Sequence, residues 1–369
     1  MSMYSIGNDL YFGNKSVKII QHRKIWFSIA CALVVIVLAA FAFKTPNLGI
    51  EFRGGSQFTI SETATQEQSL AYDAVEKVKP GSNPRVSNLG SDGMRVQTAK
   101  LNNSQTEALK AALAEAYGVS EHNVTSSYVG ASWGADIMSK AIRAMVVFMV
   151  LVSLVLVVYF RSWSIAVGAI LALLHDFVLT LGVYWIFGLE ITPATVIGLL
   201  TIMGYSLYDT VVVFDRVREN TASLQKQLRY TYEESANNAI NETLIRSINT
   251  SVTGLLPVIS VLIIGVAVFH ADTLLDLALV IFVGMALSTI SSIFIAAPLA
   301  VTLALHNKDI KAHTEHVYKV RTTVSNEGDE ASLNKDDADM LGYVPENERI
   351  PGHHLGQKAQ PKRKARSKR

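Results

Sequence analysis

Besides Asp276, which lies one turn into its apolar stretch, where a helix dipole stabilises a carboxylate, four ionisable residues lie inside or at the very start of long apolar stretches of the chain. They are His175, Asp176, Asp209 and Arg246. An ionisable group in the middle of a membrane costs at least about 2.5 to 3.5 kcal/mol on insertion scales. Residues retained at that cost are candidates for moving protons or ions, and we therefore take these four side chains as a candidate proton pathway.

Asp209 is the strongest of the four candidates. Thr201 and Tyr205 precede it at helical spacing, so the three residues form a polar stripe on an otherwise apolar helix. A carboxyl that is only hydrogen-bonded within a helix interface is the structural alternative. Adjacent residues on a helix point about 100° apart, so His175 and Asp176 face different neighbours and serve either as a proton relay or as helix contacts.

A second polar face opens the following apolar stretch. Arg246, Asn249, Thr250 and Thr253 recur at the spacings of one helical face. An arginine within about 4 to 6 Å of Asp209 would favour the ionised carboxylate, whereas desolvation would disfavour it. A carboxyl under two opposing influences can be switched by small movements, as a proton carrier requires. A snorkelling arginine at the membrane interface is the alternative for Arg246.

The composition indicates the class of protein in which these residues lie. Of 369 residues, 50% are hydrophobic and 17% charged, with a mean hydropathy of +0.28, whereas soluble domains carry about 25% charged residues. A single cysteine excludes a disulfide within the chain and a cysteine metal site. The net charge of +2 gives no reason to expect a specific nucleic-acid partner. The sequence therefore predicts a membrane protein.

Six apolar stretches have the length of a membrane-spanning helix, which needs about 20 residues. They cover residues 25–43, 144–160, 164–187, 192–214, 247–269 and 273–305. Small residues such as Gly198, Gly284, Ser288 and Ser292 are expected to let these helices approach closely.

The distribution of lysine and arginine predicts the orientation. Basic residues gather in the segment 1–24, in the loop 215–246 and in the tail, whereas the connections 188–190 and 270–272 have none. Because basic loops stay in the cytoplasm, both termini are expected there. Residues 44–140 are then extracytoplasmic.

This extracytoplasmic region is patterned as a small α+β domain. Its apolar residues and turn signals predict the order β-α-β-β-α-β, which is a ferredoxin-like fold. The first strand is expected over 49–60 with a bend at Gly54 and Gly55. Thr65 and Ser104 are expected to cap the two helices. No catalytic constellation is found in it.

Several enzyme signatures are missing from the sequence. No phosphate-binding P-loop, HExxH motif or nucleophile elbow occurs. We therefore expect no enzymatic activity, no metal and no cofactor, with protons as the coupling ion.

Four segments resemble the SecF family of bacterial protein-export subunits, which belongs to the SecD/SecF group of the resistance-nodulation-division superfamily. They lie at residues 49–55, 174–176, 204–220 and 246–251, in the order of the family. The first includes Glu51, Gly54 and Gly55. Two departures occur, because Leu207-Tyr208 replaces a more common Ile-Asn and Glu51 replaces a more common Asp.

The resemblance implies a six-span subunit of the bacterial cytoplasmic membrane that pairs with SecD. It implies work beside the SecYEG channel and the SecA motor, in which the proton gradient helps to draw an exported polypeptide outward. The family's proton-pathway aspartate falls on Asp209 and its essential arginine on Arg246.

Three alternatives stay open from the sequence: half of a small-molecule or lipid exporter, an intramembrane protease using Asp176 and Asp209, and a passive scaffold for SecD. The tail 306–369 is polar and is expected to be disordered. Its basic end fits contact with anionic lipid, contact with ribosomal RNA, or a topology signal.

Overall fold

The computed structural model describes residues 16–82, 84–90, 92–264 and 272–327, together with positions 337, 340 and 341. The chain forms two compact units. The larger comprises His22–Val211 and Arg246–Ala300, and the smaller comprises Met1–Gln21, Val212–Ile245 and Val301–Arg369. The end of the predicted span 247–269 from residue 265 on, positions 270–271 of the predicted connection, and tail positions 328–336, 338, 339 and 342–369 lie outside the described residues.

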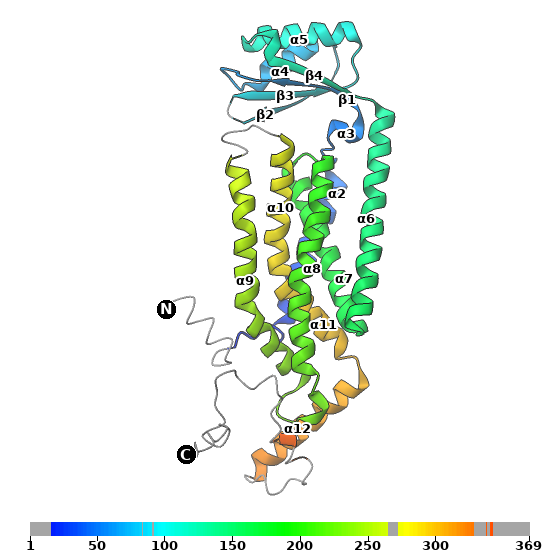
Figure 1. Ribbon diagram of the computed structural model, residues 1–369, viewed down its shortest axis with the longest axis vertical. Helices are drawn as coiled ribbons and strands as arrows, with labels where there is room; N and C mark the ends of the chain where they lie inside the picture. Colours follow the sequence, from blue (N-terminus) through cyan, green and yellow to red (C-terminus); the bar gives the residue numbers. More distant parts are fainter. Residues whose placement is uncertain are drawn as a thin grey trace, which may run out of the picture. The chain divides into compact units, whose positions relative to one another are not determined.

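Among the described residues, six helical segments are long and apolar enough to cross a membrane, as predicted (Figure 1). A helix satisfies its own backbone polar groups, which a lipid environment demands. In chain order the helices are α2 (Arg23–Phe43), α6 (Ala131–Phe160), α7 (Trp163–Phe187), α8 (Pro193–Thr221), α9 (Tyr232–Ile264) and α10 (Asp272–Ser291).

The sixth span continues beyond α10. A π-helical turn, η4 (Ser292–Ala296), follows α10 directly and leads into α11 (Ala297–Ala304). π-Turns inside α-helices are rare overall, and those that occur often lie at functional sites. The sequence pattern predicted one uninterrupted span and gave no sign of this turn.

Two spans begin well before their apolar stretches. Helix α6 starts at Ala131 instead of Ala144, and α9 starts at Tyr232 instead of Ser247. Hydropathy marks only the part of a helix that fits the membrane, whereas good helix formers extend it through polar sequence. The predicted domain boundary at residue 140 therefore falls inside α6, and most of the predicted loop 215–246 is helical.

Close helix contacts occur at predicted small residues. A Cβ atom placed on Gly198 of α8 would overlap Val280 of α10, and one on Gly284 of α10 would overlap Ile202 of α8. The absence of side chains at these two glycines lets α8 and α10 lie against each other.

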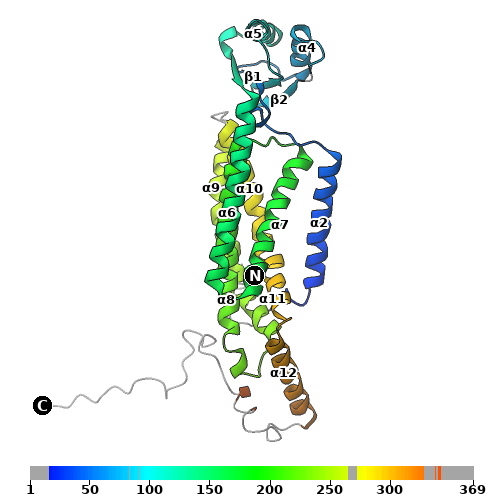
Figure 2. The same ribbon diagram turned by 90° about the vertical axis from the view of Figure 1, so that its right-hand side faces the viewer.

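A sheet domain lies between α2 and α6 in the chain. Its four antiparallel strands are arranged in the order β2-β3-β1-β4, and α4 and α5 lie together over one side of the sheet in both views (Figure 2). Its elements are α3 (Ile50–Arg53), β1 (Gly55–Ile60), α4 (Gln68–Val78), β2 (Arg85–Leu89), β3 (Gly93–Thr98), α5 (Asn103–Tyr117), η1 (Glu121–Asn123) and β4 (Val124–Val129).

The core of this domain lies between the sheet and its helices. Phe58 and Val96 from the central strands pack with Leu109 and Leu113 from α5, and all four are fully buried. After α3, the observed order of strands and helices agrees with the predicted one. Each amphipathic element buries one apolar face in this core, which holds the sheet and the helices together as packed layers.

Local predictions in the sheet domain were wrong at three points. Ile50–Arg53 forms a helix instead of the first half of a strand, because Gly54, at φ 75°, ends the turn before β1. Helix α4 starts at Gln68 without a side-chain cap. Helix α5 is capped two residues earlier than predicted, by a reciprocal Asn102–Gln105 capping box instead of Ser104, because asparagine caps helices as well as serine does.

In the smaller unit, the segment after residue 15 is bound to α9 by two buried asparagines. The side chain of Asn237 accepts a hydrogen bond from the Ile20 amide at 3.2 Å, and that of Asn241 accepts one from the Val17 amide at 2.8 Å. Amide side chains can donate as well as accept, and both also donate to the Val17 carbonyl.

The same unit contains a helix that the sequence interpretation missed. Residues Lys308–Glu327 form α12, so the prediction of disorder is wrong for this part of the tail. Val317 and Val320 are buried against Leu228, and Arg321 forms an ion pair with Glu234 at 2.7 Å. The few apolar residues of α12 are enough to stabilise this helix because they pack against a partner surface.

Candidate functional site

Asp209 lies at a meeting point of three helical elements. Its side chain, on α8, is buried and accepts a hydrogen bond from Ser247 Oγ of α9 at 2.7 Å. Its second oxygen accepts one from Ser292 Oγ of η4. A serine hydroxyl can donate to a carboxylate or accept from a protonated carboxyl. The arrangement can therefore satisfy Asp209 in both protonation states.

Asp176 forms a second buried carboxyl on the neighbouring helix α7. It accepts a hydrogen bond from Ser206 Oγ of α8 at 2.8 Å. Ser206 lies one helical turn before Asp209 on α8, so this hydrogen bond joins α7 to the part of α8 that bears Asp209. The two aspartates bond different serines, unlike an aspartic-protease pair, in which two carboxyls share one proton.

His175 contacts Asp176 only loosely. Its Nδ1 lies 3.5 Å from Asp176 Oδ1, which is the upper limit for a hydrogen bond. Its Nε2 is buried and has no hydrogen-bond partner among the described residues. The structure thus brings Asp176, His175 and Ser206 together but does not itself show a proton path through them.

The residues of the polar stripe predicted along α8 lie in different surroundings. Tyr205 is half-buried and its hydroxyl donates to the Thr250 carbonyl of α9 at 3.1 Å. Thr201 is exposed and bonds only to the Ile197 carbonyl of its own helix. Only the end of the stripe nearest Asp209 therefore joins helices.

Arg246 does not pair with Asp209 in this structure. Its side chain is exposed, and no ion pair joins the two residues in the part of the chain that the structure describes. Ser247, the next residue, takes the position beside Asp209, because successive residues on a helix point about 100° apart.

The rest of the predicted face on α9 is also directed outward. Asn249 and Thr253 are exposed, and Thr250 bonds the carbonyls of Arg246 and Ser247 in its own helix. The helical periodicity was correct, but it did not reveal that this face points away from the bundle.

Sequence reasoning missed the two serines that hold Asp209. Ser292 was expected only to allow close packing, and Ser247 was taken as the start of an apolar stretch. Serine is common in membrane helices as a small residue, so its type alone carries no signal. The place of Ser247 next to Arg246, at the start of the predicted polar face, was the hint that the sequence offered.

The predicted glycine motif has a conformational basis. Gly54 and Gly55 have φ angles of 75° and 142°, which side-chain-bearing residues rarely adopt. A Cβ atom on Gly55 would also lie 2.6 Å from the Thr98 carbonyl oxygen of β3. Glu51, just before the glycines, has a buried Oε2 without a hydrogen-bond partner among the described residues.

Among the described residues, no group of three or more histidine, cysteine, aspartate or glutamate side chains could hold a metal ion.

Comparison with known proteins identifies the family. Residues 108–306 match the model described as "Protein export membrane protein SecD/SecF, C-terminal", and residues 39–61 match the "SecD/SecF GG Motif". The chain belongs to the SecD/SecF family. Its second match contains Glu51, Gly54 and Gly55, so the strained glycine pair is part of what the family model recognises.

Two relatives extend this similarity over most of the chain. Protein translocase subunit SecF of Streptomyces coelicolor is 40% identical over 337 residues, which cover 90% of this chain and 89% of the relative. The subunit of that name from Mycobacterium tuberculosis is 40% identical over 337 residues, covering 89% and 76%. The chain is therefore a multi-pass membrane protein with a role in protein translocation.

A solved structure supports the fold. The crystal structure of SecDF, a translocon-associated membrane protein from Thermus thermophilus, matches with a TM-score of 0.70 at 30% identity. The match covers 80% of this chain and 39% of SecDF, so the chain spans less than half of that protein.

Proposed function

We propose that this chain is the SecF-type subunit of a complex that uses the proton gradient to promote polypeptide export across the bacterial cytoplasmic membrane. In this proposal both termini are cytoplasmic, and the sheet domain is an extracytoplasmic ferredoxin-like domain. The observation that carries the proposal is Asp209, a buried carboxyl held by hydroxyls from two other helical elements. An ionisable residue inside a membrane bundle is a functional site by default.

The proposed step is a change of protonation at Asp209. An ionised Asp209 accepts from Ser247 and Ser292 and draws α9 and η4 toward α8. A protonated Asp209 binds the same hydroxyls less strongly, because hydrogen bonds to charged groups are roughly twice as strong as neutral ones. Proton binding would therefore loosen α8 from its neighbours, and Ser206 would pass that movement to Asp176.

In this proposal, rotation of α9 brings Arg246 to Asp209. A turn of about 100°, the angle between successive helical residues, would replace Ser247 by Arg246 opposite Asp209. The guanidinium would then favour the ionised carboxylate and release its proton.

We further propose that a SecD-type bundle covers the exposed polar face of α9. Arg246, Asn249 and Thr253 are exposed, and polar side chains facing lipid are costly. SecDF of Thermus thermophilus combines both names in one chain, of which this chain matches 37%. Copurification in mild detergent tests this: a six-span partner should accompany the wild type and be lost when Asn249 and Thr253 are both replaced by leucine. Equal recovery with both chains would argue against this face.

Translocation in proteoliposomes tests the function. SecYEG, SecA and the SecD partner are reconstituted with this chain, and export of a secretory protein is measured with and without a proton gradient. Asp209→Asn and Arg246→Ala should insert and assemble but lose the stimulation by the gradient. Asp73→Asn, at an exposed site in the sheet domain, is the matched control and should keep it. Full stimulation with Asp209→Asn would remove the proposed proton role.

A further inference from the structure

The connection between α7 and α8 is joined to the segment that precedes the glycine motif. The Gly49 amide donates to the Ile191 carbonyl at 2.9 Å, and the Ile191 amide donates to the Asn47 carbonyl at 2.7 Å. Leu48 and Ile191 thereby form a parallel β-bridge. Helix α8, which bears Asp209, begins two residues later at Pro193.

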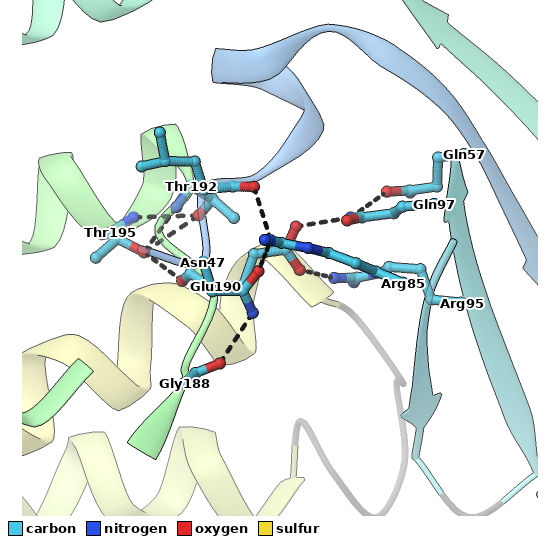
Figure 3. A network of polar contacts seen from close by, with 10 residues as sticks. Asn47, Gln57, Arg85, Arg95, Gln97, Gly188, Glu190, Thr192 and Thr195 are labelled. Carbon is cyan, nitrogen blue, oxygen red and sulfur yellow. Dashed lines mark hydrogen bonds and ion pairs between the residues drawn. The ribbon is translucent and has the colours of Figure 1, made fainter. Parts of the chain in front are cut away.

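The same connection is bound to the sheet (Figure 3). Glu190 accepts hydrogen bonds from Arg95 at 3.0 Å and Gln97 at 2.6 Å, both on β3. Arg85 of β2 contacts the side chain of Asn47. Sheet, glycine segment and α7–α8 connection therefore meet in one polar cluster around Glu190.

A second carboxyl, that of Glu51, lies at this cluster without a hydrogen-bond partner of its own for Oε2. A Cβ atom placed on Gly49 would touch Glu51 Oε2 and would lie 3.3 Å from Glu190 Oε1. The two carboxyl groups are therefore close neighbours. Glu190 is neutralised by Arg95, whereas the buried oxygen of Glu51 is not matched by a donor.

The environment of Glu51 favours its neutral form. Burial raises the pKa of Glu51, and the Glu190 carboxylate raises it further, against opposing effects of its own backbone amide and of Arg95. The charged groups on the surrounding elements are Glu190 in the connection, Arg95 on β3, Arg85 on β2, Arg53 on α3, and the exposed Asp136–Lys140 pair and Arg143 on α6.

We propose that Glu51 makes this junction a pH-sensitive latch, closed while Glu51 holds a proton and loosened when it ionises. A carboxyl that is buried beside another carboxylate must lose that burial, or keep its proton, to avoid an unpaired charge. The latch would link the pH around the sheet domain to the attachment of that domain to α8. It does not depend on proton transport through Asp209.

The direction of the pH effect follows from linkage. Below the ordinary pKa of a glutamate, both the closed and the open forms are protonated, and pH has no influence. As the pH rises toward the raised pKa of the closed form, ionisation favours opening by about tenfold per pH unit. The latch is therefore most stable in acid and loses stability as the pH rises.

Hydrogen exchange of the Gly49 and Ile191 amides, which bond across the junction, tests the latch. The full chain is placed in lipid nanodiscs, and protection factors corrected for intrinsic exchange are measured from about pH 5 to about pH 8. This whole range lies above the ordinary pKa of glutamate. Wild-type protection should fall as the pH rises. Glu51→Gln should keep high protection at every pH, and Glu107→Gln, at an exposed site on α5, should behave as the wild type.

A pH-independent wild type, or a wild-type slope in Glu51→Gln, would overturn the proposal. Glu190→Gln provides a second readout if Glu51→Gln fails to fold. It removes the negative neighbour and leaves Arg95 to face Glu51, which lowers the pKa of Glu51 in the closed form, so the fall in protection should be smaller and should end at a lower pH. A fall as large as in the wild type would also contradict the latch.

Discussion

At the scale of single residues, the central feature is a carboxyl whose two oxygens meet hydroxyls from different helices. Ser247 and Ser292 satisfy Asp209 without neutralising it. A paired arginine would hold the carboxyl ionised, whereas hydroxyl partners leave both protonation states accessible. The exposed position of Arg246 is therefore consistent with a site that must also take up a proton.

Replacement of Ser292 by alanine tests this coordination. Ser292→Ala leaves one oxygen of a buried carboxylate without a donor, which should lower the free energy of unfolding by about 1 to 3 kcal/mol. Thermal unfolding in detergent measures the loss, and gradient-stimulated translocation should fall with it.

The chain offers a matched control one residue away. Ser291 is also buried, but its hydroxyl has no hydrogen-bond partner among the described residues. Ser291→Ala should therefore leave both stability and stimulation nearly unchanged. Equal losses from the two substitutions would show that Ser292 acts through packing and not through Asp209.

The sequence could indicate the acidic members of this site but not their partners. Asp176 and Asp209 are visible because a charge in an apolar stretch is rare and costly. Ser292 depends on a π-turn, which no residue pattern in α10 announces. The outward direction of Arg246 depends on the rotation of α9 in the bundle, and periodicity defines a face without saying which neighbour it meets.

At the scale of elements, the glycine pair controls how the chain enters the sheet. Gly54 ends α3, and Gly55 starts β1 at a position where a Cβ atom would overlap the Thr98 carbonyl of β3. Since α3 also carries Glu51, the position of that carboxyl depends on this turn.

A pair of glycine substitutions separates backbone strain from close approach. Gly55→Ala introduces both a Cβ at positive φ and an overlap with Thr98, and should cost more than about 1 to 3 kcal/mol, the cost of backbone strain alone. Gly81→Ala, at φ +72° with no atom within 4 Å of the new Cβ, carries the strain alone. Chemical unfolding of the two variants measures the difference, and similar losses would exclude close approach as the reason for glycine.

Element types were more predictable than element limits. Apolar stretches of about 20 residues mark the spans, and alternating or helical apolar patterns mark the sheet domain. Helix α6 begins earlier than its apolar part because polar helix formers continue it. Helix α12 was missed because its small apolar face needs Leu228, far away in the sequence, as its partner.

At the scale of the whole molecule, the chain matches only 39% of SecDF, and its polar face on α9 is uncovered. Both facts support the proposal that the functional unit contains a second bundle. The sequence indicates six spans and an asymmetric distribution of basic residues. The physical reason to expect a partner is the exposure of Asn249 and Thr253, which only the structure shows.

Proton movement measured together with translocation tests the role of Asp209 most directly. Proteoliposomes that contain the full complex and an enclosed pH-sensitive dye are given a proton gradient and a secretory protein, and proton flux is recorded during export. We expect proton flux to accompany export in the wild type and in Asp73→Asn, and to be lost in Asp209→Asn. Undiminished flux with Asp209→Asn would contradict the claim that this carboxyl carries the proton.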